Sequence, residues 1–527
     1  MQNQFSALIS AEFRVILILR VFQRRTDFTE VCMKTVAGID LGTQSMKVVL
    51  YDYEAKKTVE SGSCPMQLIS RGDGTREQKA QWYRDGLAEC FSKISAEGKK
   101  TVQAAGVSGQ QHGFVPLDAD GEALYNVKLW NDTSTAQECI EITEALGGNE
   151  AAAAEVQNYI LPGFTAPKIL WLKKNRPELF ERLRYIMLPH DYLNYLLTGS
   201  YVTEAGDASG TALFNSRERK WSVKACSAVD SGLLEKLAPV IASDEPAGFV
   251  TAEAARLFGI PEGIPVSSGG GDNMMSAIGT GAVRNGTLTM SMGTSGTLYG
   301  FSGIPLSDPE NGISGFCSAT GGYLPLLCTM NCTVASEQIR ALLGLDVKEF
   351  DEEAKKAEPG CGGVIVLPFF NGERTPNLPH GKASITGLTA ANCGRPNIAR
   401  AALESAVYSM RGGLESFKQH GFQPQELRLT GGGAKSAVWR QIAADILNLP
   451  VKVPVSSEAA AFGAALQALW CLRKQNGCAV SMESLAAEHV SLDESKTTLP
   501  NVENARAYDS SFGEYMKLVN QVSPLYR

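Results

Sequence analysis

Two aspartates stand beside glycine-rich turns, where a carboxylate can act on a phosphoryl group. Asp40 ends an apolar segment just before the turn at 42–45, and Asp272 directly follows the three glycines 269–271. A carboxylate in such a place can hold Mg²⁺, usually through water, and can accept the proton of an attacking hydroxyl. Asp40 taken alone could equally cap its turn. Asp272 is the stronger candidate, because GGGDN puts a charge on a loop that is otherwise all backbone.

Four glycine-rich turns recur along the chain, each after an apolar segment. Turns without Cβ atoms let backbone N–H groups approach an anion closely, and neighbouring hydroxyls add donors. Taken singly, each is better explained as a structural turn, but four of them in the same setting predict loops that hold a polyphosphate from two sides. No G-x-x-x-x-G-K-[ST] motif is present, and no G-x-G-x-x-G follows the first expected strand. The turns are Gly42-Thr43-Gln44-Ser45, Gly269-Gly270-Gly271-Asp272, Gly293-Thr294-Ser295-Gly296-Thr297 and Gly431-Gly432-Gly433.

The segments around the first turn predict the elements that position it. Residues 35–40 and 46–52 are apolar and β-branched on either side of the turn, which predicts a β-hairpin. A third strand near 58–64 completes a meander, and an amphipathic helix precedes a further strand at 102–107. This order predicts a mixed-sheet α/β domain.

The second half of the chain repeats the same order. Residues 287–299 are again typical of strand, turn and strand, and a strand at 427–430 runs into the last triple glycine. A late helix contains AAAFGAA, whose small residues allow close packing against a sheet. We therefore predict two α/β domains of related fold, with a boundary near 275–285 and a ligand site in the cleft between them.

Composition restricts the classes of partner. The chain has 527 residues, 44% of them hydrophobic, and a formal net charge of −7 without a basic block. This argues against nucleic acid or an anionic membrane as the main partner. No apolar run approaches the roughly 18–20 residues of a membrane span. Glycine is in excess, at 52 residues, about a tenth of the chain against a typical ~7%.

The cysteines and the N-terminus bear on the cellular setting. Twelve cysteines without a C-x-x-C pair predict reduced thiols in a cytoplasmic protein. Residues 1–32 are expected to be an N-terminal extension, an upstream-start artefact or a disordered segment, because the text from Met33 onward resembles the start of a protein. The alternative, a docking helix, stays open. The apolar stretch at 13–22 is interrupted by arginine and makes a poor signal peptide.

Several stretches together resemble the FGGY family of carbohydrate kinases. Residues 163–175 fit the first signature of the family and 383–404 the second. The resemblance covers about 35–515. Further matching stretches are GQQHG (109–113), LWND (129–132), LPGFTAPK (161–168), LPHDYLNYLLTG (188–199), SGGGDN (268–273), SMGTSG (291–296), NGERTP (371–376) and TGGGAKSAVWRQIAADIL (430–447).

The resemblance implies a role for each matching residue. Asp272 corresponds to the proton acceptor, and Asp40 to the aspartate beside metal and phosphates, so both are candidate metal ligands. Position 111 is glutamine where methionine is also familiar, which leaves open the hydroxyl that it contacts. The implied substrate-binding residues are Gln111, His112, Trp130, Asp132, Asp272 and Asn273. The implied nucleotide-binding residues are Asp40, Gly42, Thr43, Gln44, Ser45, Gly293, Thr294, Ser295, Gly432, Gly433 and Ser436.

The resemblance also implies an architecture. We expect two actin-like, ribonuclease H-like ATPase domains with an interdomain cleft. Residues 33–280 would form the sugar-binding domain, 281–515 the nucleotide-binding domain and 516–527 a C-terminal tail. ATP and Mg²⁺ are the implied cofactors and a small sugar the implied partner, with no nucleic acid and no membrane. The resemblance leaves a homodimer open.

The implied reaction is transfer of the γ-phosphate of ATP to the terminal C5 hydroxyl of D-xylulose. Asp272 would orient this hydroxyl and take its proton late, so that a raised pKa is not required. Ribulose, gluconate, rhamnulose, fuculose and glycerol are alternative substrates. An actin- or chaperone-like ATP-binding protein, or a non-catalytic sensor, is the alternative from another class. The sugar-side segments and GERTP argue against the former, and intact Asp40 and Asp272 against the latter.

Overall fold

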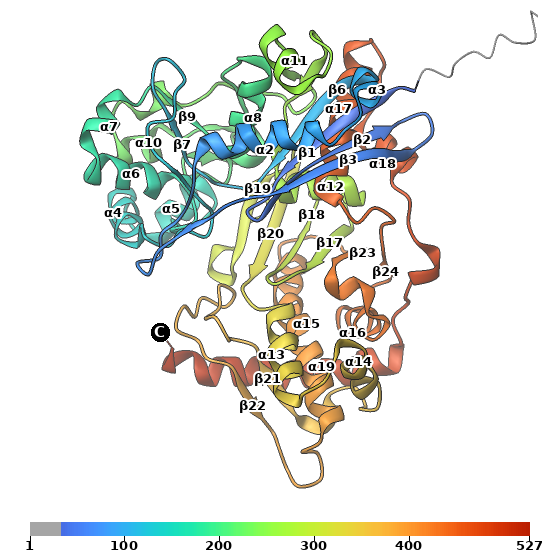
Figure 1. Ribbon diagram of the computed structural model, residues 1–527. Coiled ribbons are helices and arrows are strands. Elements are labelled where there is room, and N and C mark those ends of the chain that lie inside the picture. Colours follow the sequence, from blue (N-terminus) through green and yellow to red (C-terminus); the bar gives the residue numbers. More distant parts are fainter. Residues whose placement is uncertain (1–32, 527) are drawn as a thin grey trace, which may run out of the picture.

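The computed structural model describes residues 33–526, and its first half is built on a seven-stranded sheet (Figure 1). The expectation for residues 1–32 lies outside the described residues. In this sheet β1 pairs antiparallel with β2 and parallel with β6. The strand order is β14 (Pro246–Phe249), β15 (Pro265–Ser267), β6 (Val102–Gly109), β1 (Thr35–Leu41), β2 (Ser45–Asp52) and β3 (Lys57–Pro65), with β16 (Gly270–Gly271) beside β6.

A second sheet of the same design lies below the first in Figure 1. Its central strand β17 pairs antiparallel with β18, which follows it in the chain, and parallel with β23 on its other side. This repeats the pairing of β1 with β2 and β6, so the prediction of two related α/β domains is confirmed. The order is β19 (Ile313–Cys317), β20 (Tyr323–Thr329), β18 (Gly296–Gly300), β17 (Thr287–Met292), β23 (Glu426–Gly431) and β24 (Val451–Lys452).

The late helix α17 (Ala459–Gln475) lies against the first sheet, although it comes from the end of the chain (Figure 1). Its backbone approaches two glycines of that sheet: a Cβ on Gly38 would lie 1.9 Å from the Ala461 carbonyl oxygen, and a Cβ on Gly106 would lie 2.1 Å from the Ala464 carbonyl oxygen. The expected close packing of its small residues is therefore present. The contact ties the end of the chain to its first domain.

Helix α12 (Asp272–Thr280) packs on α17 with the same closeness. A Cβ on Gly463 would lie 1.8 Å from the Met275 carbonyl oxygen, and a Cβ on Gly279 would lie 2.0 Å from the Ala459 carbonyl oxygen. No side chain fits between these two backbones. The close contact of the two helices therefore fixes the position of Asp272, the first residue of α12.

The remaining helices pack on the sheets or on one another. The first half carries α2 (Ala80–Ser92), α3 (Ala96–Lys100), α4 (Ala136–Leu146), α5 (Asn149–Val156), α6 (Thr165–Asn175), α7 (Pro177–Arg182), α8 (Pro189–Thr198), α9 (Ala205–Ala208), α10 (Val223–Val229) and α11 (Ala252–Phe258). The second half carries α13 (Thr333–Leu343), α14 (Val347–Lys355), α15 (Arg395–Gln419), α16 (Ala437–Leu447), α18 (Met482–His489) and α19 (Val502–Val522).

Short strands form smaller sheets within residues 33–526. They are β4 (Ile69–Ser70) and β8 (Val127–Lys128) on either side of β5 (Arg76–Gln78), β7 (Val115–Leu117) with β9 (Tyr185–Met187), β10 (Thr203–Glu204) with β13 (Val240–Ile241), β11 (Phe214–Asn215) with β12 (Lys220–Trp221), and β21 (Ile365–Leu367) with β22 (Ser384–Thr386). No helix within residues 33–526 is long and apolar enough to cross a membrane.

The C-terminal segment differs from its expectation as a tail beginning at 516. Helix α19 continues through that point to Val522, and its side chains Tyr515 and Val519 are buried in the core of the second domain. Apolar residues at helical spacing anchor this segment, so it is a structural part of the domain.

Candidate active site

The register of the first sheet brings Asp40 and Asp272 to one edge. Asp40 lies opposite Ser108 on β6, and Gly271 of β16 lies opposite Gly109, so Asp272 follows at the carboxyl end of the same strands. The carboxyl ends of parallel strands are the usual place for a ligand in α/β sheets. Two aspartates that are far apart in the sequence thus lie at the same edge of the first sheet.

Both carboxyl groups have a raised pKa. Burial raises the pKa of Asp40 to about 6, although the Ser108 hydroxyl donates a hydrogen bond of 2.8 Å to its Oδ1. Burial, and next the negative charge of Asp40, raises the pKa of Asp272 to about 7. A cation between two such carboxylates would relieve their repulsion. The pair therefore suits a divalent ion.

The number of protein ligands limits how such an ion could be held. Within residues 33–526 no cluster of three or more His, Cys, Asp or Glu side chains could hold a metal. Mg²⁺ is typically held by one or two carboxylates together with phosphate oxygens and water. Asp40 and Asp272 fit that donor set, with the nucleotide supplying the rest.

The first glycine turn is closed by its own backbone. The Gly42 N–H donates to the Ser45 carbonyl at 2.9 Å, and the side chains of Gln44 and Ser45 are exposed. The Thr43 hydroxyl donates to Gln110 at 2.9 Å and accepts from the Trp130 indole N–H at 3.0 Å. Thr43 therefore connects the turn to Trp130, and the predicted roles of Thr43 at the phosphates and of Trp130 at the sugar stay predictions.

Two glycine loops of the second sheet lie side by side. Gly431 is opposite Met292, the residue before Gly293, so the 293–295 turn and the triple glycine share one end of the sheet. Gly431 has φ +82°, and a Cβ there would lie 2.5 Å from the Met292 carbonyl oxygen. A Cβ on Gly433 would lie 2.9 Å from the Met292 Cβ. Only glycine permits this approach.

The other predicted nucleotide-side residues border these loops. Thr294 and Gly432 are exposed, and Ser295 is half-buried. The Ser436 hydroxyl accepts a hydrogen bond of 3.1 Å from the Trp439 N–H and so caps helix α16. Its acceptor capacity is therefore used in part by the protein.

Asn273 connects the sugar-side loop to the aspartate. Its side-chain amide donates to Gln111 Oε1 at 2.7 Å and to Asp272 Oδ1 at 3.0 Å, and its backbone N–H donates to Asp272 Oδ1 at 2.8 Å. The Nε2 of Gln111 is buried and has no hydrogen-bond partner among the described residues. A buried donor without a partner is costly unless a ligand or water supplies an acceptor, so Gln111 suits a hydroxyl-bearing ligand.

His112 stands where the two domains meet. Its ring lies 5.1 Å from that of Phe164 and 5.4 Å from that of Phe316, which is on β19 of the second sheet. Burial, and then the charges of Lys168 and Arg374, hold the pKa of His112 well below its usual range. The imidazole is therefore neutral and can both donate and accept one hydrogen bond.

Asp132 is fully buried and its carboxylate has protein partners on both oxygens. Oδ2 accepts from the Arg76 N–H at 2.8 Å and pairs with Lys128 at 3.2 Å, and Oδ1 accepts from the Ser134 N–H at 3.0 Å. This arrangement holds the loop that carries Trp130. A contact of Asp132 with a substrate stays a prediction without further support from the geometry.

Four further side chains at this site escaped the sequence reasoning. Lys168 and Arg374 lie inside matching stretches, LPGFTAPK and NGERTP, without a role having been assigned to them. His190 and Asp207 face each other at 3.0 Å beneath His112. The His190 stretch offered a signal through its HD pair, whereas nothing around Asp207 marks it.

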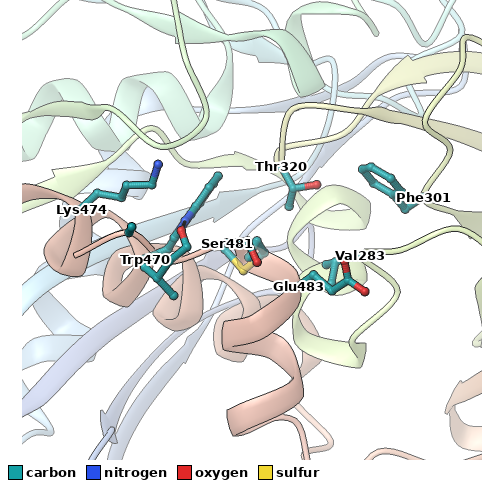
Figure 2. Close-up of a pocket in the computed structure, with 10 residues that line it drawn as sticks. Val283, Phe301, Thr320, Trp470, Lys474, Ser481 and Glu483 are labelled. Carbon is teal, nitrogen blue, oxygen red and sulfur yellow. Dashed lines mark hydrogen bonds between the residues drawn. The ribbon is translucent and has the colours of Figure 1, made fainter. Parts of the chain in front are cut away.

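A separate pocket of about 380 Å³ lies near the other end of α12 (Figure 2). Its lining includes Val283 and Phe301 of the second half of the chain and Trp470 and Lys474 of α17. No residue of the predicted site lines it. It is therefore distinct from the edge that carries Asp40 and Asp272.

Two sheets of one design, with glycine turns from both and paired carboxylates at the edge of the first, define a two-domain phosphotransferase of the ribonuclease H-like class. Residues 35–279 match the model of the N-terminal domain of the FGGY family of carbohydrate kinases, and residues 278–472 match its C-terminal domain. The chain therefore belongs to the FGGY family of carbohydrate kinases. Kinases of this family use ATP as the phosphate donor.

Similar proteins of known name extend over nearly the whole chain. The xylulose kinase of Haemophilus influenzae is 41% identical over 494 residues, covering 92% of this chain and 99% of that protein. The xylulose kinase of Streptomyces coelicolor is 37% identical over 85% of this chain and 90% of that protein. The crystal structure of xylulose kinase from Bifidobacterium adolescentis superposes with a TM-score of 0.78 at 30% identity, covering 91% of this chain and 99% of that one.

Proposed function

We propose that this protein transfers the γ-phosphate of ATP to the terminal C5 hydroxyl of D-xylulose, giving D-xylulose 5-phosphate. The similar proteins are xylulose kinases, which supports D-xylulose as the substrate. The observation that carries the chemistry is the connection Gln111–Asn273–Asp272, beside Asp40. It links a sugar-side amide to the proposed proton acceptor in one hydrogen-bonded unit.

The proposed sugar-binding residues supply polar contacts of both kinds. Gln111 presents an unpaired donor, and neutral His112 presents one donor and one acceptor. Trp130 offers an apolar face that Thr43 holds in place. Asp272 orients the terminal hydroxyl and removes its proton as the bond to phosphorus forms.

The proposed nucleotide site uses the glycine turns of both sheets. The turns at 42–45, 293–295 and 431–433 bring backbone close to the phosphates, with 33–280 as the sugar-binding and 281–515 as the nucleotide-binding domain. Asp40 and Asp272 would hold Mg²⁺, with water and phosphate completing its shell. When bound, the ion neutralises charge on the transferred phosphoryl group.

Two further proposals concern the setting of the enzyme. A cytoplasmic location is supported by the cysteines, since those within residues 33–526 are all free thiols. The homodimer that the resemblance left open stays a prediction, and size-exclusion chromatography with light scattering would test it.

A substrate panel tests the proposed function. ADP release is followed with D-xylulose, ribulose, gluconate, rhamnulose, fuculose and glycerol, with sugar-free protein as the background. We expect the highest kcat/KM for D-xylulose and a 5-phosphate product. A higher kcat/KM for another compound would reassign the substrate within the family. Absence of sugar-stimulated ADP release with every compound would contradict the proposal.

A further inference from the structure

Four buried ionisable side chains form a row that ends at His112. His190 Nε2 lies 2.9 Å from Asp191, and His190 Nδ1 lies 3.0 Å from Asp207 Oδ2. The other oxygen of Asp207, Oδ1, faces His112. The side chains of His190 and Asp207 are completely buried, and His112 and Asp191 nearly so. The row consists of two carboxylates that alternate with two imidazoles.

The contacts of His190 fix its charge state. Burial alone would lower the pKa of His190, yet Asp191 and Asp207 together raise it well above its usual range. Burial raises the pKa of Asp207, and the hydrogen bond and charge of His190 oppose that rise. The raised pKa favours the protonated form of His190, whose positive charge favours the carboxylate form of Asp207 next to His112.

The backbone of His112 is held from both sides in an unusual conformation. Its φ is +62°, in the left-handed region that residues other than glycine rarely adopt. Its N–H donates to Asp207 Oδ1 at 3.4 Å, and its carbonyl accepts from Lys168 Nζ at 2.7 Å and from Thr165 Oγ1 at 3.1 Å. Strained backbone that the surroundings hold so firmly is typical of functional sites.

The ring of His112 is held as firmly as its backbone. A Cβ on Gly210 would lie 1.8 Å from the ring carbon Cε1, so the ring rests on bare backbone between Phe164 and Phe316. Its Nδ1 is buried, lies 3.6 Å from Asp207 Oδ1 and has no hydrogen-bond partner among the described residues. A movement of a few tenths of an ångström would close that hydrogen bond, as often happens when a substrate binds.

We propose that Asp207 is a positioning residue that keeps the ring proton of His112 on Nδ1 and so makes Nε2 a hydrogen-bond acceptor for one hydroxyl of the sugar. A neutral imidazole has one N–H, and the carboxylate beside Nδ1 decides which nitrogen carries it. The identity of the ligand rests on the proposed function, whereas the position of the proton does not. The site then offers the sugar one hydrogen-bond donor, the unpaired Nε2 of Gln111, and one acceptor, the Nε2 of His112.

The first test locates the ring proton in the full chain without sugar. The protein is labelled with ¹⁵N-histidine, and the resonances of His112 are assigned by their loss in His112→Gln. The ¹⁵N shifts distinguish a protonated from a bare ring nitrogen. We expect a protonated Nδ1 and a bare Nε2. A bare Nδ1, or a fully protonated ring at neutral pH, would overturn the proposal.

The second test compares Asp207→Asn with the matched control Asp191→Asn. Both variants remove one carboxylate from His190, but only Asp207 faces His112. We expect Asp207→Asn to move the His112 proton from Nδ1 and to raise the KM for D-xylulose about 10–100-fold with little change in the KM for ATP. Asp191→Asn should leave the proton on Nδ1 and change the sugar KM far less.

The outcomes separate the two proposals. If Asp191→Asn moves the proton and the sugar KM as much as Asp207→Asn does, the row is merely structural and the proposal fails. It also fails if Asp207→Asn leaves both unchanged. If no compound of the substrate panel is phosphorylated, the proposed function fails, and the ¹⁵N measurement still decides the role of Asp207. If Asp207→Asn does not fold, the wild-type measurement decides alone.

Discussion

Gln111 accepts a hydrogen bond of 2.7 Å from Asn273 across 162 positions of sequence. Asn273 also donates to Asp272, so the loop after β6 and the start of α12 form one unit. This bond places the proposed sugar-binding amide at a fixed position relative to the proposed proton acceptor. The rigid pairing of α12 with α17 keeps that unit in place.

Replacing His112 by alanine should weaken sugar binding and spare the nucleotide. The variant loses the neutral imidazole between Phe164 and Phe316, while the glycine turns of the nucleotide site stay intact. We expect the KM for D-xylulose to rise, or the sugar preference to change, with the sugar-free ATPase background unchanged. Steady-state kinetics with D-xylulose and with ATP as the varied substrate measures both. An unchanged sugar KM and preference would remove His112 from the sugar site.

Gly463→Ala should destabilise the protein strongly. A Cβ at Gly463 would lie 1.8 Å from the Met275 carbonyl oxygen, so α12 and α17 must separate. Overpacking of this kind costs typically about 1–3 kcal/mol. Thermal unfolding should show a lower Tm than for the wild type.

Gly412→Ala is the matched control for this change. Gly412 also lies within a helix, α15, but a Cβ there meets nothing within 4 Å. Alanine is favoured over glycine inside helices by roughly 0.5–1 kcal/mol, so this variant should be equal to or more stable than the wild type. Equal Tm values for the two variants would contradict the close packing of α12 on α17.

Lys168 should make stability depend on pH. Burial lowers its pKa to about 7, and a neutral amine has two N–H groups for the carbonyls of His112 and Gly163. Between pH 7 and the ordinary lysine pKa, the unfolded chain then binds one proton more than the folded chain. The free energy of unfolding therefore rises with pH, by at most about 1.4 kcal/mol per pH unit.

The comparison with Lys168→Met isolates this contribution. Denaturant unfolding is measured at pH 7, 8 and 9. The free energy of unfolding of the wild type, minus that of the variant, should increase as the pH rises. A constant difference across this window would mean that Lys168 stays protonated in the folded protein. A decrease of this difference with rising pH would contradict the lowered pKa of Lys168 in the folded protein.

The two sheets could be predicted from the sequence because their signals are local. Apolar and β-branched segments on both sides of a glycine turn predict a hairpin wherever it lies in the chain, and the same order at 35–52 and 287–299 indicated two copies. Asp272 was recognised for a similar reason, since a charge after three glycines has few structural explanations.

The contacts between distant segments could not be predicted in this way. The small residues of α17 indicated close packing, but not that the partner is the first sheet, because that depends on how the whole chain folds back. Asp132 stays a predicted pocket residue, but the sequence did not indicate that its carboxylate also binds the Arg76 N–H, Lys128 and Ser134. The sequence around Asp207 did not indicate a functional role, because its partner His190 lies on another helix and is brought close only by the fold.

The most direct test of the account is the turnover of Asp272→Asn with D-xylulose and ATP. Asparagine keeps the shape of the side chain and its place beside Asn273 but cannot take a proton. We expect kcat to fall by a factor of at least about 10²–10⁴, as measured by coupled ADP release, and ATP binding to be retained, as measured by nucleotide titration. Near-normal turnover in this variant would contradict the role of Asp272 as the proton acceptor.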